Sequence, residues 1–167
     1  MMMRRRLLLG CTTALTLAGC GFALRGAPEL AFRSLYVNAG ETSLVGNELK
    51  RNLRSLGALT LIDDPTLMQS ADAVLDFLSE AREKTVVGVN TSGQVREFQL
   101  RSRLQFRLRT PRGKELIAPT ELVLQRDISF NESAVLAKEA EEGLIYRDMQ
   151  SDIVQQLLRR LAAVKSL

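Results

Sequence analysis

Arginines at alternate positions are the residues of this sequence best suited to binding chemistry. The segment 97–110 reads EFQLRSRLQFRLRT and places four of them on one side of an extended chain, at Arg101, Arg103, Arg107 and Arg109. A guanidinium group is planar and permanently charged, and it binds phosphate or carboxylate groups bidentately. Alternate residues of a strand lie about 6.6 Å apart along its axis. This arginine row therefore predicts a surface that can meet several anionic groups, the alternative being a cationic strand face that is only solvated.

The same segment predicts the strand that carries the arginine row. Its apolar residues share the opposite side, with Ser102 as the only polar member: Phe98, Leu100, Leu104, Phe106 and Leu108. A period of two is typical of a β-strand with one buried face and one wet face. Such a strand would be roughly 45 Å long, and we expect it to lie in the middle of a sheet.

Three further strands and two helices are expected around it. Alternation indicates strands near 34–39, 71–89 and 116–130, and apolar residues every three or four positions indicate helices near 43–56 and after residue 131. Residues 58–62 fit either a short strand or an extended connection. We predict an α+β fold, a two-layer sandwich in which two helices pack on one face of a mixed, largely antiparallel sheet of about four strands. The arginine row would lie on the other, open face.

Three single residues refine this expectation. Gly57 is placed to end the first helix in a left-handed conformation. Pro119 favours an edge position or a bulge in the last strand, because proline cannot donate to a ladder. Gly143 lies inside the last helical segment, where it is a candidate for a kink.

The residue types give little support to catalytic or metal-binding chemistry. The sequence contains no histidine, which is the commonest general base and metal ligand. No nucleophile elbow, glycine-rich phosphate loop or carboxylate cluster is recognisable, although serine–lysine or paired-carboxylate catalysis stays formally possible. We predict that the chain is not an enzyme and uses no cofactor or metal.

Residues 1–19 have the pattern of a lipoprotein signal peptide. Three arginines precede an apolar stretch that is too short to span a bilayer, and Leu-Ala-Gly leads directly into Cys20. We predict cleavage before Cys20 and acylation of its thiol, the alternative being an ordinary secretory signal with an incidental cysteine. Residues 20–32 would then form a lipidated tether, and residues 33–167 a single domain.

Cleavage would change the charge balance of the chain. The net charge is +4 at pH 7, and loss of the three arginines in residues 1–19, which contain no acidic residue, lowers it to +1. The electrostatic footprint of a nucleic-acid-binding protein is therefore absent. Cys11 leaves with the signal and Cys20 would be acylated, so no cysteine remains for a disulfide, a nucleophile or a metal site.

Several motifs, taken in order, carry a family resemblance. They are CGFALRG at 20–26, RDISF at 126–130, LAKE at 136–139, YRDM at 146–149 and QLLRRL at 156–161. Each is weak alone, but their order and spacing resemble the LptE family, the lipopolysaccharide-assembly lipoproteins of the Gram-negative outer membrane. The resemblance covers essentially the whole mature chain.

This resemblance implies a sandwich that plugs the lumen of the outer-membrane β-barrel LptD, helps to assemble it, and binds lipopolysaccharide on its way to the outer leaflet. It implies an outer-membrane lipoprotein carrying palmitate, anchored on the periplasmic side with its domain inside the barrel. Gly21, directly after the cysteine, resembles an outer-membrane sorting signal. The alternative is a lipoprotein adaptor that regulates another envelope complex, such as a cell-wall synthase.

The resemblance also suggests which residues meet lipopolysaccharide. Lys138 matches a lysine that the family associates with this contact, and we add it to the arginine row as a predicted binding residue. The row would bind the phosphates of lipid A or, alternatively, meet the barrel wall. The turn at 90–92 is neutral here, where family members can carry a basic residue.

Overall fold

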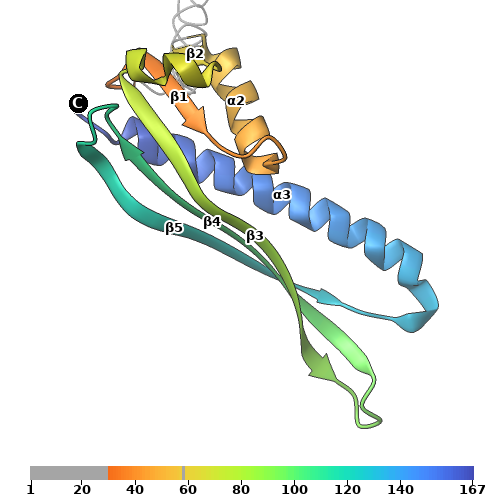
Figure 1. Ribbon diagram of the computed structural model, residues 1–167. Coiled ribbons are helices and arrows are strands. Elements are labelled where there is room, and N and C mark those ends of the chain that lie inside the picture. The colour runs from red at the N-terminus through yellow and green to blue at the C-terminus, as the bar shows by residue number, and fades with distance from the viewer. Residues whose placement is uncertain (1–29, 58) are drawn as a thin grey trace, which may run out of the picture.

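The computed structural model describes residues 30–57 and 59–167, which form a helix layer packed on one face of a sheet (Figure 1). The sheet has five strands in the order β2-β1-β3-β4-β5. Their bounds are β1 Ser34–Asn38, β2 Thr60–Ile62, β3 Ala73–Val89, β4 Val95–Arg109 and β5 Glu115–Ser129. The helix layer consists of α2 Leu44–Leu56 and α3 Val135–Ala162, and two 3₁₀ helices are η2 Pro65–Ser70 and η3 Glu132–Ala134.

The predicted α+β class and the two-layer arrangement are confirmed, with one strand more than expected. The additional strand is β2, which pairs in parallel with β1 from Ser34↔Thr60 to Tyr36↔Ile62. Its three residues are too few to show an alternation, so the sequence could not separate a strand from an extended connection there. The pairs β1–β3 are also parallel, whereas β3–β4 and β4–β5 are antiparallel.

Strand β4 is an interior strand between β3 and β5, but the middle position of the five-stranded sheet, predicted for it, belongs to β3, because β1 and β2 extend the sheet on the other side. Its apolar side chains face the helix layer, and Leu100, Leu104, Phe106 and Leu108 are fully buried there. Ser102 is buried on the same side. Because β4 pairs along most of its length with both neighbours, its backbone is fixed from two sides.

Strand β5 forms an edge of the sheet, and its proline lies at an irregularity of the ladder. The register changes between the pairs Phe106↔Thr120 and Leu108↔Ile117, which leaves Pro119 within the shifted segment. Proline lacks the N–H that a regular ladder needs, so an edge strand with a bulge can accommodate it. Both structural expectations for Pro119 are confirmed.

Helix α2 begins and ends at residues whose chemistry suits those positions. The Ser43 hydroxyl accepts a hydrogen bond from the Gly46 N–H at 2.8 Å, which satisfies one unpaired donor of the first turn. Gly57 has φ of 64° and ends the helix in the left-handed conformation. The buried positions of this helix are Val45, Gly46, Leu49 and Leu53.

Helix α3 spans 28 residues and runs along the sheet, from near the β3–β4 hairpin to the end that contains the β4–β5 turn. It continues through Gly143 without a break, so the glycine does not end or divide it. Its C-terminal half contributes Ile153, Val154, Leu157 and Leu161 to the main core. Its N-terminal half is largely exposed, and Leu136 retains 83% of its accessible surface.

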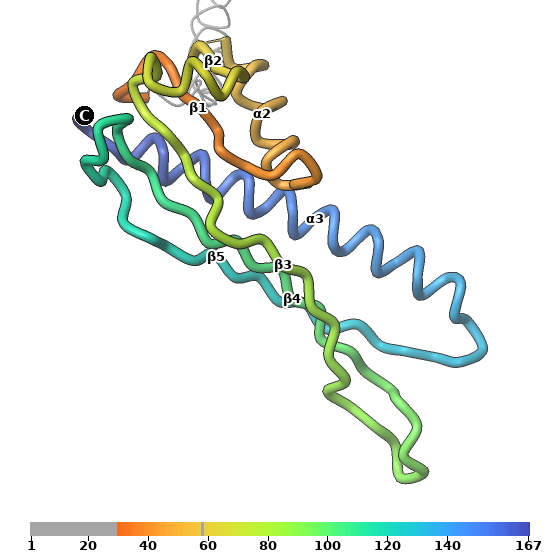
Figure 2. The backbone as a smooth tube through the Cα atoms, in the orientation of Figure 1, coloured from red at the N-terminus to blue at the C-terminus, as the bar shows by residue number. Residues whose placement is uncertain are grey.

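Polar contacts hold α3 where apolar packing becomes sparse. Arg82 of β3 donates to the Gln150 side chain at 2.8 Å, and the Tyr146 hydroxyl donates to the Glu83 carbonyl oxygen at 2.8 Å. The guanidinium of Arg82 also lies over the Tyr146 ring. Beyond these contacts the β3–β4 hairpin projects past β5, and Figure 2 shows its turn as the distal tip of the molecule.

We expect Leu157→Ala to lower the free energy of unfolding by about 2–5 kcal/mol, because it removes a fully buried side chain and leaves a cavity. Chemical or thermal denaturation measures this loss. Leu136→Ala on the same helix is the matched control and should change stability by less than about 0.5 kcal/mol. Equal effects of the two substitutions would contradict the packing described here.

Candidate functional site

The arginine row lies on the open face of the sheet, opposite the helix layer. The four side chains come from alternate positions of β4, and their apolar neighbours in sequence point into the core. Arg101, Arg103 and Arg107 retain 39%, 40% and 38% of their side-chain surface, whereas Arg109 retains 18%. The predicted placement is confirmed, but the row divides into two pairs with different surroundings.

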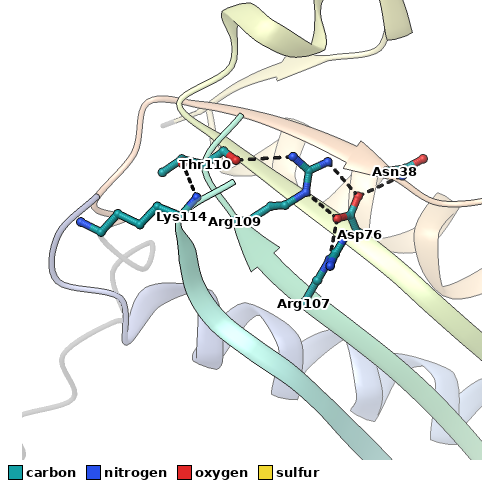
Figure 3. A network of polar contacts seen from close by, with 6 residues as sticks. All are labelled: Asn38, Asp76, Arg107, Arg109, Thr110 and Lys114. Atoms are coloured by element: carbon teal, nitrogen blue, oxygen red, sulfur yellow. Dashed lines mark hydrogen bonds and ion pairs between the residues drawn. The ribbon is translucent and has the colours of Figure 1, made fainter. Parts of the chain in front are cut away.

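Arg107 and Arg109 converge on one buried carboxylate, that of Asp76 on β3 (Figure 3). Arg107 Nε lies 2.9 Å and Arg109 Nε 2.8 Å from Asp76 Oδ2. The Asn38 amide of β1 donates to Oδ1 at 2.9 Å. Only 5% of the Asp76 side chain is accessible. Since its partners come from β1 and β4, this cluster joins three strands on the open side of the sheet.

The electrostatics of Asp76 follow from these contacts. Burial on its own raises the pKa of the carboxyl, but hydrogen bonds from Arg109, Asn38 and Arg107 lower it more strongly. The net result is a pKa below the usual value of an aspartic acid, so Asp76 is ionised at neutral pH. Arg107 and Arg109 are therefore held by a permanent anion of the protein itself.

Arg101 and Arg103 are held less tightly, by the half-exposed Glu83. Arg103 Nη2 lies 2.6 Å from Glu83 Oε1, and Arg101 Nη1 lies 3.7 Å from Glu83 Oε2. Arg103 also approaches Glu121 at 4.0 Å. Exposed ion pairs of this kind contribute little to stability and exchange readily with solvent or another anion. Of the row, this pair is the better suited to bind an external anionic group.

Lys138 does not lie with the arginine row. It belongs to the helix layer, where its Nζ is 2.8 Å from Glu141 Oε2 and 3.1 Å from the Ser129 hydroxyl oxygen. It borders a cavity of about 240 Å³ between the start of α3, the start of β4 and the end of β5. The floor of this cavity is apolar and includes Phe98 and Phe130, whose rings meet edge to face at 5.3 Å.

A second lysine lies beside this cavity. Lys84 Nζ is placed over the Phe98 ring at 4.3 Å from its centroid and pairs with Glu142 at 2.6 Å. The cavity therefore has an apolar floor and two lysines at its rim, Lys84 and Lys138, each of which pairs with a glutamate of α3. Alternation in β3 weakens after Ser79, and that loss of pattern hid the position of Lys84 from sequence reasoning.

Sequence reasoning also missed the acidic partners of the arginine row. The one available signal was Asp76 itself, a lone carboxylate inside the apolar run AVLDFL. A charge in such a run is expected to be paired if it is buried. Its partner could not be chosen from sequence, because the β3–β4 register contains an irregularity at Phe77/Ser79.

The remaining predicted features fall partly outside the described residues. Cys20, the signal peptide 1–19 and most of the tether 20–32 lie there. Within 30–57 and 59–167, no group of acidic residues has the arrangement of a metal site. In that same part of the chain, none of the helices combines the length and the apolarity that crossing a membrane requires.

These observations define a class of protein, namely a small α+β binding or assembly domain that carries a charged open sheet face. Comparison with known proteins agrees with this class. Residues 32–161 match the family model LptE, described as lipopolysaccharide-assembly. The chain belongs to the LptE family.

Individual relatives support the assignment along nearly the whole chain. The LPS-assembly lipoprotein LptE of Pectobacterium atrosepticum is 29% identical over 167 residues, which cover 97% of this chain and 88% of the relative. That of Yersinia enterocolitica is 32% identical and covers 95% of this chain and 75% of the relative. The family resemblance seen in the sequence is confirmed. So is the prediction that the chain is not an enzyme, because these relatives are named as assembly lipoproteins.

Solved structures confirm the fold independently. The solution structure of an uncharacterized lipoprotein B from Nitrosomonas europaea superposes with a TM-score of 0.73 at 35% identity and covers 86% of this chain and 91% of that one. The rare lipoprotein B from Shewanella oneidensis has a TM-score of 0.66 at 22% identity, covering 78% of this chain and 95% of that one. The second likeness bears on the fold alone.

We expect Asp76→Asn to lower the free energy of unfolding at pH 7 by about 1.5–3 kcal/mol, because it removes charged hydrogen bonds from a buried site. Since the folded-state pKa of Asp76 is depressed, its stabilisation is present above the unfolded pKa. It is lost as the pH falls through the folded pKa. The difference in stability between the two proteins should therefore begin to shrink below about pH 4 and vanish only below the folded pKa.

The matched control is Asp152→Asn, whose carboxylate pairs with Arg126 at 3.3 Å but retains 55% of its surface. This change should cost less than about 1 kcal/mol at pH 7. A constant difference between wild type and Asp76→Asn across the whole pH range would show that the ionised carboxylate is not the stabilising species.

Proposed function

We propose that this chain is an outer-membrane lipoprotein of lipopolysaccharide assembly that plugs and helps to assemble the LptD β-barrel. The observation that carries the proposal is the family match over residues 32–161, which spans the whole described domain apart from its ends. The relatives' name, LPS-assembly lipoprotein, supports the same role. Within this role the domain binds lipopolysaccharide and aids its delivery to the outer leaflet.

The open sheet face suits a position inside a barrel. A two-layer domain leaves one face of its sheet wet, and here that face carries half-exposed ion pairs along β4, with Val123 as an exposed apolar neighbour of Arg103. The lumen of a large outer-membrane barrel is polar, so such a face can meet the wall without burying an apolar patch. The elongated shape of the β3–β4–β5 ribbon supports the same placement (Figure 1).

Anchoring follows from the N-terminal segment. We propose that residues 1–19 are removed, that Cys20 is acylated with palmitate among its chains, and that residues 20–32 tether the single domain 33–167. Several acyl chains anchor a protein stably, whereas one chain binds a membrane only marginally. The protein would be held on the periplasmic side of the outer membrane, with its domain in the barrel lumen.

Lipopolysaccharide offers both phosphates and acyl chains, and the described domain offers a place for each. Arg101 and Arg103 are the exposed cations of the arginine row and can exchange Glu83 for a phosphate. The cavity beside Lys138 has an apolar floor with cations at its rim. Arg107 and Arg109 are committed to Asp76, so we assign them to holding the sheet.

The proposed role is tested by isolating the protein from membranes under mild detergent. We expect a stable complex with one very large outer-membrane β-barrel, identified by mass spectrometry. Depletion of the protein should lower the amount of correctly assembled barrel. A stable complex with a cell-wall synthase, and no barrel, would replace this function with the adaptor role.

We expect Arg101→Gln/Arg103→Gln to weaken binding of purified lipopolysaccharide by about 5- to 30-fold, at about 0.5–1 kcal/mol for each exposed charge. The melting temperature should stay nearly unchanged, because both side chains are half exposed. Affinity at two salt concentrations is the measurement, and the variant should show the smaller salt dependence.

The matched comparison is Arg107→Gln/Arg109→Gln, which removes the same charge from the same strand. This variant should lose stability, because it leaves the buried Asp76 without its cationic partners. Normal lipopolysaccharide binding by Arg101→Gln/Arg103→Gln, together with loss of the barrel complex, would mean that the pair meets the barrel wall.

A further inference from the structure

Charge is distributed unevenly along the long axis of the molecule. The proximal end, where the described chain begins, also contains the β4–β5 turn and the end of α3 (Figures 1 and 2). Six exposed cations gather on these segments and are named here the proximal patch: Arg33, Arg112, Lys114, Arg159, Arg160 and Lys165. They come from three separate parts of the sequence, so the patch is a product of the fold.

Hydrogen bonds and a shared cavity show how these segments meet. Lys114 Nζ donates to the main-chain oxygen of Leu167 at 3.0 Å, which joins the β4–β5 turn to the end of the chain. Both segments line a cavity of about 570 Å³ together with Asp72, which precedes β3. Asp72 in turn accepts the backbone N–H of Arg33 at 2.9 Å. The patch is therefore held on one continuous end of the protein.

Acidic residues at this end, namely Asp64, Asp72 and the exposed Glu115 beside Lys114, are fewer than the six cations of the patch. Asp72 accepts the backbone N–H groups of Arg33 and Ser34, and these hydrogen bonds, together with the positive charge of Arg33, hold its pKa below the usual value despite its partial burial. Asp64 accepts from Thr66 at the start of η2. Within the described part of the chain, none of the six cations lies within 4.0 Å of an acidic side chain. This is the opposite of the arginine row, whose members all have acidic partners.

The distal end carries the opposite charge. Exposed acids collect at the start of β4, the end of β5, η3 and the first half of α3, and they outnumber the exposed cations there, Arg96, Arg126 and Arg147. These acids are Glu97, Asp127, Glu132, Glu139, Glu141 and Asp148. The domain is thus positive where its N-terminal tether enters and negative at the far end. An anionic surface would attract the first end and repel the second.

We propose that the proximal patch docks on anionic phospholipid headgroups of the membrane that holds the lipid anchor. The inference rests on the anchoring part of the proposed function, and it does not depend on the barrel. Leu30, the first described residue, follows Cys20 by ten positions, so an anchored domain stays within about 33–36 Å of the membrane. Exposed charges act over about 8–10 Å at physiological salt, so a short tether at the cationic end would raise the frequency with which the patch comes within range of the headgroups. Basic clusters next to a lipid anchor supply a second, electrostatic binding signal.

Vesicle flotation tests the docking directly. The probe is the mature chain, residues 20–167, with Cys20→Ala so that no acyl chain contributes, and circular dichroism confirms its fold. The vesicles are phosphatidylcholine alone or phosphatidylcholine with about one third phosphatidylglycerol. We expect binding to the anionic vesicles only, weakening as salt shortens the screening length. Equal binding to both vesicles, or none to either, would overturn the proposal.

Two charge-matched variants locate the surface. Arg112→Gln/Lys165→Gln removes two cations of the patch, whereas Arg96→Gln/Arg147→Gln removes two equally exposed cations elsewhere. Because each basic residue near an anionic surface strengthens binding severalfold, the proximal variant should lose roughly tenfold or more. The control variant should lose less than about twofold. An equal loss in both would show that net charge, and not the patch, governs binding.

Orientation provides an independent readout, because the Cys20→Ala mature chain contains no cysteine. A single fluorophore can be placed by Ser166→Cys at the proximal end or by Ser92→Cys at the tip of the hairpin. Only the label at 166 should respond to anionic vesicles. A response at position 92 that equals or exceeds it would contradict the proposed orientation.

Failure of this inference is separable from failure of the proposed function. The vesicles contain neither lipopolysaccharide nor barrel, and the anchored proximal variant should still co-purify with the barrel. Absence of vesicle binding with a normal barrel complex would remove the docking surface and leave the plug role intact. Loss of the barrel complex in the proximal variant would instead assign the patch to a protein contact and overturn the lipid assignment.

Discussion

The burial of one face of β4 is the constraint on which the rest of the structure depends. Its apolar residues at alternate positions are fully enclosed by the helix layer, and both long antiparallel ladders run along it. A register slip of one residue would move Leu104 and Phe106 into water and the arginine row into the core. The same alternation therefore determines where α3 packs, which face of the sheet stays open and where the cations lie.

The four arginines on the open face need acidic partners, and the neighbouring strand β3 supplies them in two ways. Near β1, where the sheet is widest, Asp76 is buried and fixes Arg107 and Arg109. Farther along β4, Glu83 stays half exposed and pairs loosely with Arg101 and Arg103. Breaking a buried pair costs far more than exchanging an exposed one. Residues that look equivalent in the sequence thus divide into a structural pair and an available pair.

Features encoded by local sequence could be predicted, and those that depend on register between distant segments could not. The alternation of β4, the terminator Gly57 and the edge proline Pro119 each depend on neighbours a few residues away. The partners of the arginine row are 18–33 residues distant, across a ladder whose irregularities no local pattern marks. Lys138 lies on the last helix, as the sequence predicts. It is separated from the arginine row because the helix layer and the open face are on opposite sides of the sheet, which no local pattern shows. Strand β2 is too short to carry a period of its own.

The proximal patch stays positively charged because nearby acidic residues bind backbone N–H groups instead of its side chains. Asp72 and Asp64 accept backbone N–H groups, so they stabilise the chain at the start of β1 and of η2, and neither forms a close ion pair with a cation of the proximal patch. Such cations act only at short range, because salt screens them beyond about 10 Å. At the distal hairpin they would lie far from the start of the described chain, which is at the other end of the molecule. With the proposed lipid anchor, a tether at the proximal end would bring these cations repeatedly to the membrane surface, so the anchor and the proximal patch would reinforce each other.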